Sequence, residues 1–217
     1  MDKWKVLKTI EETGIVAIVR GIKVEEILPI AAALYEGGIR VIEVTCNTKG
    51  YLRIIETLSD QMEDRMFVGA GTVLNPTMAQ MVLDAGAKFV LAPDFNPDVI
   101  TTVHEKQKLV IPGVATPTEI IQAHRLGVDL VKVFPAGALG ARYLKEIRGP
   151  LGNAAVLPVG GITLGNIKEF AQAGAYAVGV GGELVDKKAI DQGNYNVLTQ
   201  HAKAFIAAFK EGKDSQK

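Results

Sequence analysis

The feature that most constrains this chain is an alternation of eight short apolar runs with longer segments of helical period. Uniformly apolar runs of this length are typical of parallel strands that are buried on both faces. The segments between them repeat apolar residues at helical spacing, as Ile27, Ile30 and Leu34 do. We therefore expect strands at Ile15–Val19, Arg40–Val44, Met66–Gly69, Lys88–Leu91, Leu109–Ile111, Leu130–Phe134, Ala155–Val159 and Tyr176–Val180.

Glycine stands at the same place in four of the predicted units, after the helix and before the next strand. A helix commonly ends at a residue with a left-handed backbone, which glycine adopts without strain. Each unit takes about 25 residues, near the lower limit for an eightfold barrel. The glycine stops are Glu36-Gly37-Gly38-Ile39, Asp84-Ala85-Gly86-Ala87, Arg125-Leu126-Gly127-Val128 and Gln172-Ala173-Gly174-Ala175.

The whole pattern predicts one α/β domain over residues 1–217, a compact (β/α)8 TIM barrel with additional N- and C-terminal helices. We expect a helix at Lys3–Thr13 to cover the bottom of the barrel and another at Tyr195–Lys210. The polar tail from about residue 211 is expected to fray. An open doubly wound sheet is the alternative, although it needs fewer strands and Gly69–Thr72 is not a dinucleotide-binding fingerprint.

Charge and cysteine content exclude several functional classes. The 24 basic and 24 acidic residues balance, which argues against a nucleic-acid or membrane-surface partner. The single cysteine, Cys46, excludes an intrachain disulfide and a cysteine-based zinc cluster. His104, His124 and His201 lack metal-ligand spacing, so we expect surface histidines and no metal site. Because no signal-peptide core or membrane-spanning run occurs, we expect a cytoplasmic protein.

Two ionisable residues interrupt runs that otherwise read as buried strands. Lys132 lies within Leu130–Phe134, and Glu43 lies within 41–45. Burial favours the neutral amine, which can attack a carbonyl carbon and form a Schiff base. If strand alternation turns both side chains inward, the carboxylate can move protons while the amine holds the substrate. A paired core lysine, or a simple ion pair between the two residues, is the structural alternative.

Two glycine pairs follow the last two predicted strands, Gly160-Gly161 and Gly181-Gly182. In barrels of this kind, backbone N–H groups at these two loops commonly bind a phosphate group. The repetition after adjacent strands favours a phosphate site. Glycines that serve only as turns are the alternative.

A longer pattern surrounds these residues, in the segments Ile39–Thr45, Val68–Leu74, Ile111–Glu119, Val131–Ala136 and Pro158–Ile162. Together the segments resemble the class I aldolases that act on 2-keto-3-deoxy-6-phosphogluconate (KDPG) and 4-hydroxy-2-oxoglutarate (KHG). The resemblance runs roughly from Gly14 to Val185. It implies a carbon–carbon lyase of carbohydrate metabolism, without a metal or organic cofactor, that assembles as a homotrimer.

The resemblance also implies roles for individual residues. Lys132 matches the Schiff-base lysine, and Glu43 matches the general acid and base that acts through water and proton shuttling. Thr72 matches a residue that hydrogen-bonds the pyruvate carboxylate. Pocket-lining and phosphate-binding positions of the family correspond to Pro93, Phe134, Gly160, Gly161 and Gly182.

Several residues depart from the pattern of the family. Asn47 stands where many members carry an arginine that grips the substrate carboxylate, and Arg20 is the expected replacement. Gly182 stands where some relatives have a serine, which leaves only its backbone amide for phosphate. Arg20, Asn47 and Val159 together look more like the aldolases for the galactonate epimer, so both configurations at the substrate C4 remain open.

The sequence thus predicts cleavage of KDPG to pyruvate and glyceraldehyde 3-phosphate, with cleavage of KHG to pyruvate and glyoxylate as a further activity implied by the resemblance. Two alternatives from other classes share the glycine loops. One is a phosphate-binding barrel that isomerises or condenses a phosphorylated metabolite, with Lys132 as an electrostatic clamp. The other is a non-catalytic barrel that senses a ligand.

Overall fold

The predicted apolar runs form strands, and a further two-residue strand follows the fifth run. The computed structural model describes residues 3–215. Pro112 separates this short strand from the fifth run, because proline has no N–H group to donate to a neighbouring strand. The strands are β1 (Ile15–Val19), β2 (Val41–Thr45), β3 (Phe67–Gly71), β4 (Phe89–Leu91), β5 (Leu109–Ile111), β6 (Gly113–Val114), β7 (Val131–Val133), β8 (Val156–Pro158) and β9 (Val178–Val180).

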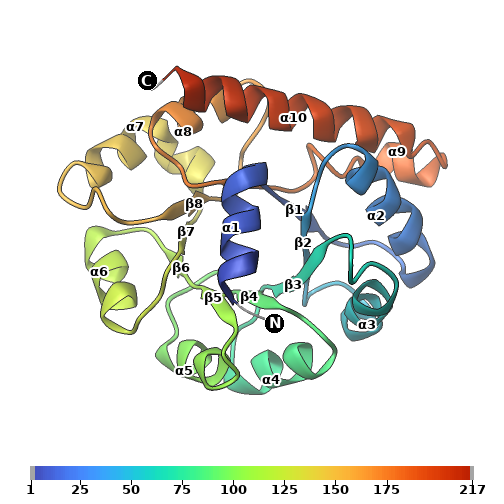
Figure 1. The fold of residues 1–217 in the computed structure, drawn as a ribbon, viewed down its shortest axis with the longest axis horizontal. Helices are drawn as coiled ribbons and strands as arrows, with labels where there is room; N and C mark the ends of the chain where they lie inside the picture. The colour runs from blue at the N-terminus through green and yellow to red at the C-terminus, as the bar shows by residue number, and fades with distance from the viewer. Residues whose placement is uncertain (1–2, 216–217) are drawn as a thin grey trace.

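All pairings between the named strands are parallel, in a six-stranded sheet of order β5-β4-β3-β2-β1-β9 and a three-stranded sheet of order β6-β7-β8. A single bridge between Val159 and Gly179 connects the end of β8 to β9. Figure 1 shows the strands curled around a common interior, with helices outside them. The fold is therefore α/β with a curled parallel sheet.

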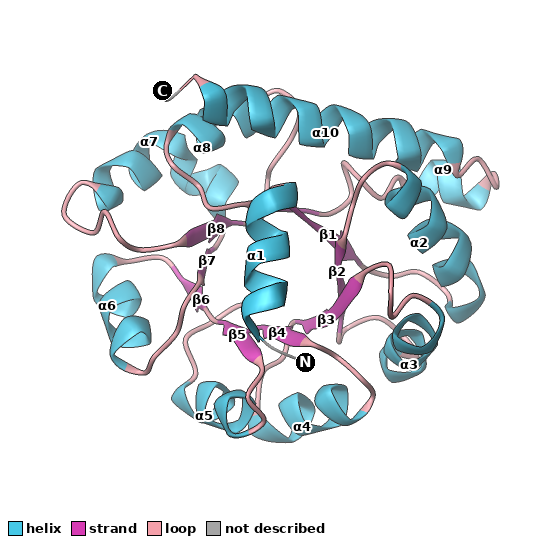
Figure 2. Ribbon diagram, viewed as in Figure 1, coloured by secondary structure: helices cyan, strands magenta, loops and turns pink. Residues whose placement is uncertain are grey.

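Helices follow most of the strands and form the outer layer (Figure 2). The helical segment that contains Ile27, Ile30 and Leu34 is preceded by a 3-10 turn, η1 (Val24–Glu26). No helix among the described residues is long and apolar enough to cross a bilayer. The helices are α1 (Lys3–Thr13), α2 (Ile27–Glu36), α3 (Tyr51–Gln61), α4 (Pro76–Asp84), α5 (Pro97–Glu105), α6 (Pro117–Arg125), α7 (Ala136–Arg148), α8 (Ile167–Gln172), α9 (Lys187–Asp191) and α10 (Asn196–Asp214).

The four predicted glycine stops share one hydrogen-bonded ending. Gly38, Gly86, Gly127 and Gly174 have φ values of 99°, 104°, 78° and 90°. Behind each glycine, an N–H group reaches back five residues to a carbonyl of the last helical turn, which is the Schellman ending. These bonds are Ile39 to Leu34, Ala87 to Val82, Val128 to Ala123 and Ala175 to Phe170, at 3.0–3.2 Å.

Alternation along the strands separates two cores. One core packs the outward strand faces, including Ile42 and Val44, against the helices. The other fills the interior, where Val41 and Leu130 lie, and α1 adds buried side chains to it. Helix α1 also contacts β1, β2 and β5 and crosses one end of the interior, as predicted (Figure 1). The opposite end, where the strands finish, is left for a site.

The C-terminal helix is longer than its sequence predicted. We expected it to end at Lys210 and the tail to fray from about residue 211, but α10 continues to Asp214. Glu211 pairs with Lys168 at 2.8 Å, and Lys213 Nζ donates to the Ala175 carbonyl at 3.1 Å. These contacts with the α8 region hold the polar turn in place. The last two residues of the predicted tail, 216–217, lie outside the described residues.

Candidate active site

A cavity of about 710 Å³ opens at the C-terminal ends of the strands. Residues that the sequence singled out meet here from β2, β7 and the loops after β1, β3, β4, β7, β8 and β9. Parallel strands present their carboxyl ends at one edge, which is why residues so distant in sequence converge. The predicted site residues that line the cavity are Arg20, Glu43, Thr72, Pro93, Lys132, Phe134, Val159, Gly160, Gly161, Gly181 and Gly182.

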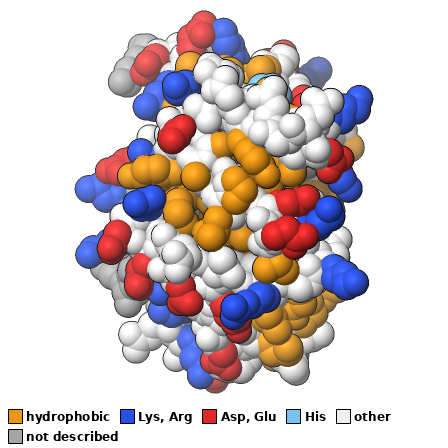
Figure 3. Space-filling model, turned by 90° about the vertical axis from the view of Figure 1, so that its right-hand side faces the viewer, with side chains coloured by type: hydrophobic (Ala, Val, Ile, Leu, Met, Phe, Trp, Pro, Cys, Tyr) orange, Lys and Arg blue, Asp and Glu red, His pale blue; other side chains and the backbone are white. Residues whose placement is uncertain are grey.

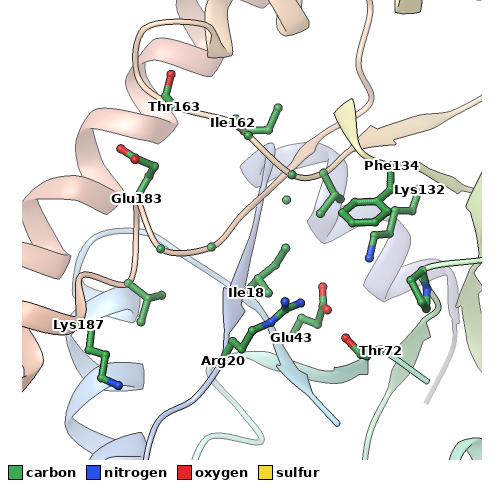
Figure 4. Close-up of a pocket in the computed structure, with 18 residues that line it drawn as sticks. Ile18, Arg20, Glu43, Thr72, Lys132, Phe134, Ile162, Thr163, Glu183 and Lys187 are labelled. Carbon is green, nitrogen blue, oxygen red and sulfur yellow. The ribbon is translucent and has the colours of Figure 1, made fainter. Parts of the chain in front are cut away.

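Lys132 and Glu43 project inward from the middle of β7 and β2. Their exposed fractions are 5% and 1%. Figure 4 shows the Lys132 amine and the Glu43 carboxylate directed into the same space, with Arg20 and Thr72 beside them. Neighbouring strands hold this geometry, because Glu43 is paired in register with Ile18 and Gly69, and Lys132 with Gly113 and Leu157.

Burial disfavours the charge on both of these groups. Desolvation lowers the pKa of Lys132, and the nearby Arg20 lowers it further, while the Glu43 carboxylate acts in the opposite direction. Desolvation raises the pKa of Glu43, partly offset by the positive charges of Lys132 and Arg20. The neutral amine and the neutral acid are therefore both more accessible than on a surface, which suits imine formation and proton transfer.

The Glu43 carboxylate occupies space that the neighbouring strand leaves empty. A Cβ atom at Gly71 would overlap Glu43 Oε1, so a larger residue there is incompatible with this rotamer. Glu43 Oε2 is buried and has no hydrogen-bond partner among the described residues. A buried carboxylate oxygen without a partner is unfavourable unless a ligand or water uses it. This oxygen of the Glu43 carboxylate is therefore free to bind a ligand or water in the cavity.

Gly71→Ala is expected to lower kcat by about tenfold, because its methyl group overlaps the Glu43 carboxylate and forces it out of its position at the cavity. Stopped-flow rates of aldol cleavage, with circular dichroism to verify folding, measure this effect. Gly69→Ala is the matched control, since its Cβ atom overlaps the Phe89 ring instead. We expect that variant to lose stability and keep its kcat. Equal kcat losses in both variants would contradict the role of Gly71.

Thr72 and Phe134 line opposite parts of the cavity. Thr72 has a φ of 59°, a left-handed backbone that strains a β-branched residue. This backbone accompanies a hydroxyl group that points into the cavity (Figure 4). The ring of Phe134 lies 5.0 Å from Lys132 Nζ, measured to its centroid. The ring covers the amine on that side and helps to keep it from water.

The two glycine loops differ in their steric freedom. Gly160 and Gly161 have φ values of 87° and 73°, and a Cβ atom on Gly161 would lie 3.0 Å from Gly137 Cα. Both residues therefore need to be glycine for the chain to fold this way. At Gly181 and Gly182 an added Cβ atom meets nothing within 4 Å. Glycine there leaves room in the cavity that the fold itself does not require.

The loop after β2 carries Asn47, which the sequence predicted at the substrate, and Cys46. Asn47 is exposed and does not line the cavity, although the sequence placed it at the substrate. Cys46, in the same loop, is buried outside the cavity, and its N–H group bonds to the Gly71 carbonyl at 2.8 Å. Burial and the nearby Glu43 raise the pKa of Cys46 to about 12. Neither side chain is among those that line the cavity.

The histidines take no part in the cavity. His124 is exposed, whereas His104 and His201 are half-buried rather than on the surface as expected. They lie on three separate helices, α5, α6 and α10. Within residues 3–215, no three His, Cys, Asp or Glu side chains are grouped so that they could hold a metal ion.

Further residues line the cavity that sequence reasoning did not single out. Glu183 directly follows the second glycine pair, and Thr163 lies two residues after the first. Their closeness in sequence to these glycines could have indicated that they reach the cavity. Lys187, at the start of α9, also lines the cavity, but it is not next to any motif in the sequence that would have indicated this. The additional lining residues are Ile18, Ile162, Thr163, Gly179, Glu183, Val185 and Lys187.

A curled parallel α/β sheet with a desolvated lysine and carboxylate in one cavity at its strand ends defines a carbon–carbon lyase of the Schiff-base class. The family model described as KDPG and KHG aldolase matches residues 6–201. The chain therefore belongs to the KDPG and KHG aldolase family.

Individual relatives agree with this assignment. The KHG/KDPG aldolase of Escherichia coli K12 is 32% identical over 97% of this chain and 100% of its own length. The 2-dehydro-3-deoxy-6-phosphogalactonate aldolase of the same organism is 30% identical over 91% of this chain and 95% of its own. The KDPG aldolase of Legionella pneumophila, solved with pyruvate captured as a covalent carbinolamine, has a TM-score of 0.86 and 30% identity over 91% of this chain and 96% of its own.

Proposed function

We propose that this chain cleaves a phosphorylated 2-keto-3-deoxy sugar acid, KDPG, to pyruvate and glyceraldehyde 3-phosphate through a Schiff base on Lys132. The observation that carries the proposal is the buried pair of Lys132 and Glu43 in one cavity. The capture of pyruvate as a carbinolamine in the Legionella relative supports the chemistry. The decisive experiment is reductive trapping of pyruvate on Lys132, with which the Discussion opens.

In the proposed mechanism the neutral Lys132 amine adds to the C2 ketone, and loss of water gives a protonated imine. Glu43 then accepts the proton of the C4 hydroxyl group, the bond between C3 and C4 breaks, and its electron pair moves into the imine to give an enamine. The aldehyde leaves. Glu43 returns its proton to C3, and water hydrolyses the imine to release pyruvate and the free amine.

The charges of the cavity favour this sequence of steps. Before the substrate binds, burial raises the pKa of Glu43. The positive imine then stabilises the carboxylate that must accept the C4 proton. In this proposal Arg20 and the Thr72 hydroxyl group bind the carboxylate of the pyruvate portion. Both line the cavity beside Lys132 (Figure 4).

The phosphate group is proposed to lie against the Gly160-Gly161 and Gly181-Gly182 loops, where glycine lets the backbone approach its oxygens. Gly182→Val fills the open space there and is expected to lower kcat/KM for the phosphorylated substrate by about 10- to 100-fold, since a hydrogen bond to a charged group contributes about 1.5–3 kcal/mol. KHG has no phosphate group and should react almost as before. Steady-state kinetics on both substrates measures the difference.

Gly152→Val serves as the control for this prediction, because its loop lies outside the cavity and an added Cβ atom has only ordinary contacts. Gly161→Val is unsuitable, since its left-handed backbone and its contact with Gly137 would disturb the fold itself. Equal proportional losses on both substrates in Gly182→Val would argue against the phosphate site.

A second candidate substrate is the galactonate epimer at C4. Two observations favour it: the similarity to the E. coli phosphogalactonate aldolase, and the presence in the cavity lining of Arg20 and Val159, which the sequence analysis related to the galactonate enzymes. Cleavage of the two C4 epimers, measured side by side, distinguishes the candidates. A higher kcat/KM for the galactonate epimer would replace KDPG as the main substrate.

We further propose that the two sheets act as one closed (β/α)8 TIM barrel in a single domain spanning residues 1–217. The bridge from Val159 to Gly179 supports this at one junction, and chain continuity through Pro112 supports it at the other. A homotrimer in a reducing cytoplasm completes the proposal. Apolar side chains grouped on one face (Figure 3) support self-association, and the single cysteine suits a reducing compartment. Light scattering in solution tests the trimer.

A further inference from the structure

Two buried threonine hydroxyl groups connect the loops that follow β1 and β2. Thr45 ends β2 and is fully buried, and Thr48 lies in the next turn with an exposed fraction of 2%. Their hydroxyl oxygens are 3.1 Å apart. Neither side chain lines the cavity, so neither contacts a substrate there directly.

The outer partners of this pair fix the direction of every hydrogen bond. The Gly21 N–H group donates to Thr48 Oγ1 at 3.0 Å, and Thr45 Oγ1 donates to the Val19 carbonyl at 3.3 Å. Because the N–H group can only donate and the carbonyl can only accept, the Thr48 hydroxyl must donate to Thr45. Each hydroxyl group therefore donates once and accepts once, and the chain of three bonds has no alternative arrangement.

The ends of this chain of bonds fall on the two residues that flank Arg20. Val19 precedes Arg20 at the end of β1, and Gly21 follows it with a left-handed φ of 66°. Among residues 3–215, the Arg20 side chain makes no salt bridge with another side chain. Its guanidinium group nevertheless lines the cavity beside Glu43 (Figure 4). The position of the guanidinium group therefore depends on the backbone on both sides of Arg20. No salt-bridge partner of the side chain among the described residues fixes it.

We propose that Thr48, acting through Thr45, is a positioning residue that holds Arg20 at the cavity for binding the substrate carboxylate. The inference rests on the role proposed for Arg20 above. The proposal also assigns a role to the loop after β2, since Cys46 and Asn47 of that loop both lie outside the cavity. Lys49, the cation of that loop, does not line the cavity, and the loop instead fixes the neighbouring loop that carries Arg20.

Thr48→Val tests the proposal, because valine keeps the shape of threonine and removes the hydroxyl group. The readout is the pyruvate concentration that gives half-maximal borohydride trapping, measured together with kcat and KM for cleavage. We expect Thr48→Val to raise this concentration by about tenfold, as Arg20→Ala does, with a smaller change in kcat. In the Arg20→Ala background, Thr48→Val should add less than about twofold, because the residue that it positions is already absent.

Three further variants separate positioning from general damage. Thr48→Ser restores the hydroxyl group and should return the half-saturating pyruvate concentration to within about twofold of wild type. Thr199→Val removes another buried hydroxyl group, which donates to the Ala33 carbonyl at 2.9 Å between α10 and α2. It should lower Tm without changing pyruvate binding. Thr45→Val breaks the same chain of bonds and decides the question if Thr48→Val does not fold.

The outcomes distinguish this inference from the proposed function beneath it. If Arg20→Ala leaves pyruvate binding unchanged, the proposed role of Arg20 in binding the carboxylate is wrong, and the positioning role of Thr48 is wrong with it. If Arg20→Ala weakens binding while Thr48→Val does not, positioning alone is overturned. A loss from Thr48→Val that persists in full in the Arg20→Ala background would also overturn it.

Discussion

Lys132→Met is expected to abolish both aldol cleavage and the borohydride-dependent attachment of pyruvate to the chain. Methionine fills a similar volume in the buried site but has no amine to form an imine. In the wild type, mass spectrometry of proteolytic peptides should place one reduced three-carbon unit on Lys132. The trapping rate should fall as the pH drops through the lowered pKa of Lys132, at a pH below the range where an exposed lysine loses its reactivity.

Lys213→Met is the matched control for this experiment. Burial also lowers the pKa of Lys213, but its amine bonds to the Ala175 carbonyl and it lies outside the cavity. That variant should retain both the label and the activity. A label on a lysine other than Lys132, or undiminished cleavage in Lys132→Met, would contradict the assignment of the Schiff base to Lys132.

Glu43→Gln is expected to slow cleavage by about 10²- to 10⁴-fold, the usual contribution of a positioned acid or base. The exchange of the pyruvate methyl protons with solvent should slow by a similar factor, because both reactions move a proton at C3 of the enamine. Trapping of pyruvate on Lys132 should persist, since the amine remains. Nuclear magnetic resonance follows the exchange, and quenched-flow borohydride reduction follows the imine.

Glu183→Gln provides the comparison, because this carboxylate lines the same cavity but is exposed and points away from Lys132 (Figure 4). Its proton-exchange rate should stay near that of the wild type. If Glu43→Gln also exchanges at the wild-type rate, Glu43 serves as the structural partner of the lysine, and another group or a water molecule carries the proton.

The secondary structure could be predicted from sequence because its causes are local. The apolar runs set the strands, and glycines with left-handed backbones end four of the helices. The sequence did not indicate a helix end of this kind where a residue other than glycine has the left-handed backbone. Gln107 has a φ of 53°, and the following Lys108 N–H group bonds five residues back to Val103 at 3.2 Å. Nothing in the residue type of Gln107 indicates that ending.

The site residues divide in a similar way. Lys132 and Glu43 could be found because a charge within a buried strand is unfavourable and therefore conspicuous. Asn47 was expected at the substrate but is not among the residues that line the cavity, because sequence position gives the loop in which a side chain lies but not its direction. Lys187 and the Thr45–Thr48 chain of hydrogen bonds gave no signal, since each depends on loops that are distant in sequence.

The sequence by itself determined the periodicity of strands and helices, the helix ends and the identity of the buried amine and carboxylate. Each of these follows from interactions within a few residues or from the cost of burying a charge. Only the tertiary structure decided that Gly71 leaves space for the Glu43 carboxylate and that buried hydroxyl groups fix the backbone around Arg20. These depend on strand register and loop direction, which arise when segments far apart in the chain pack together.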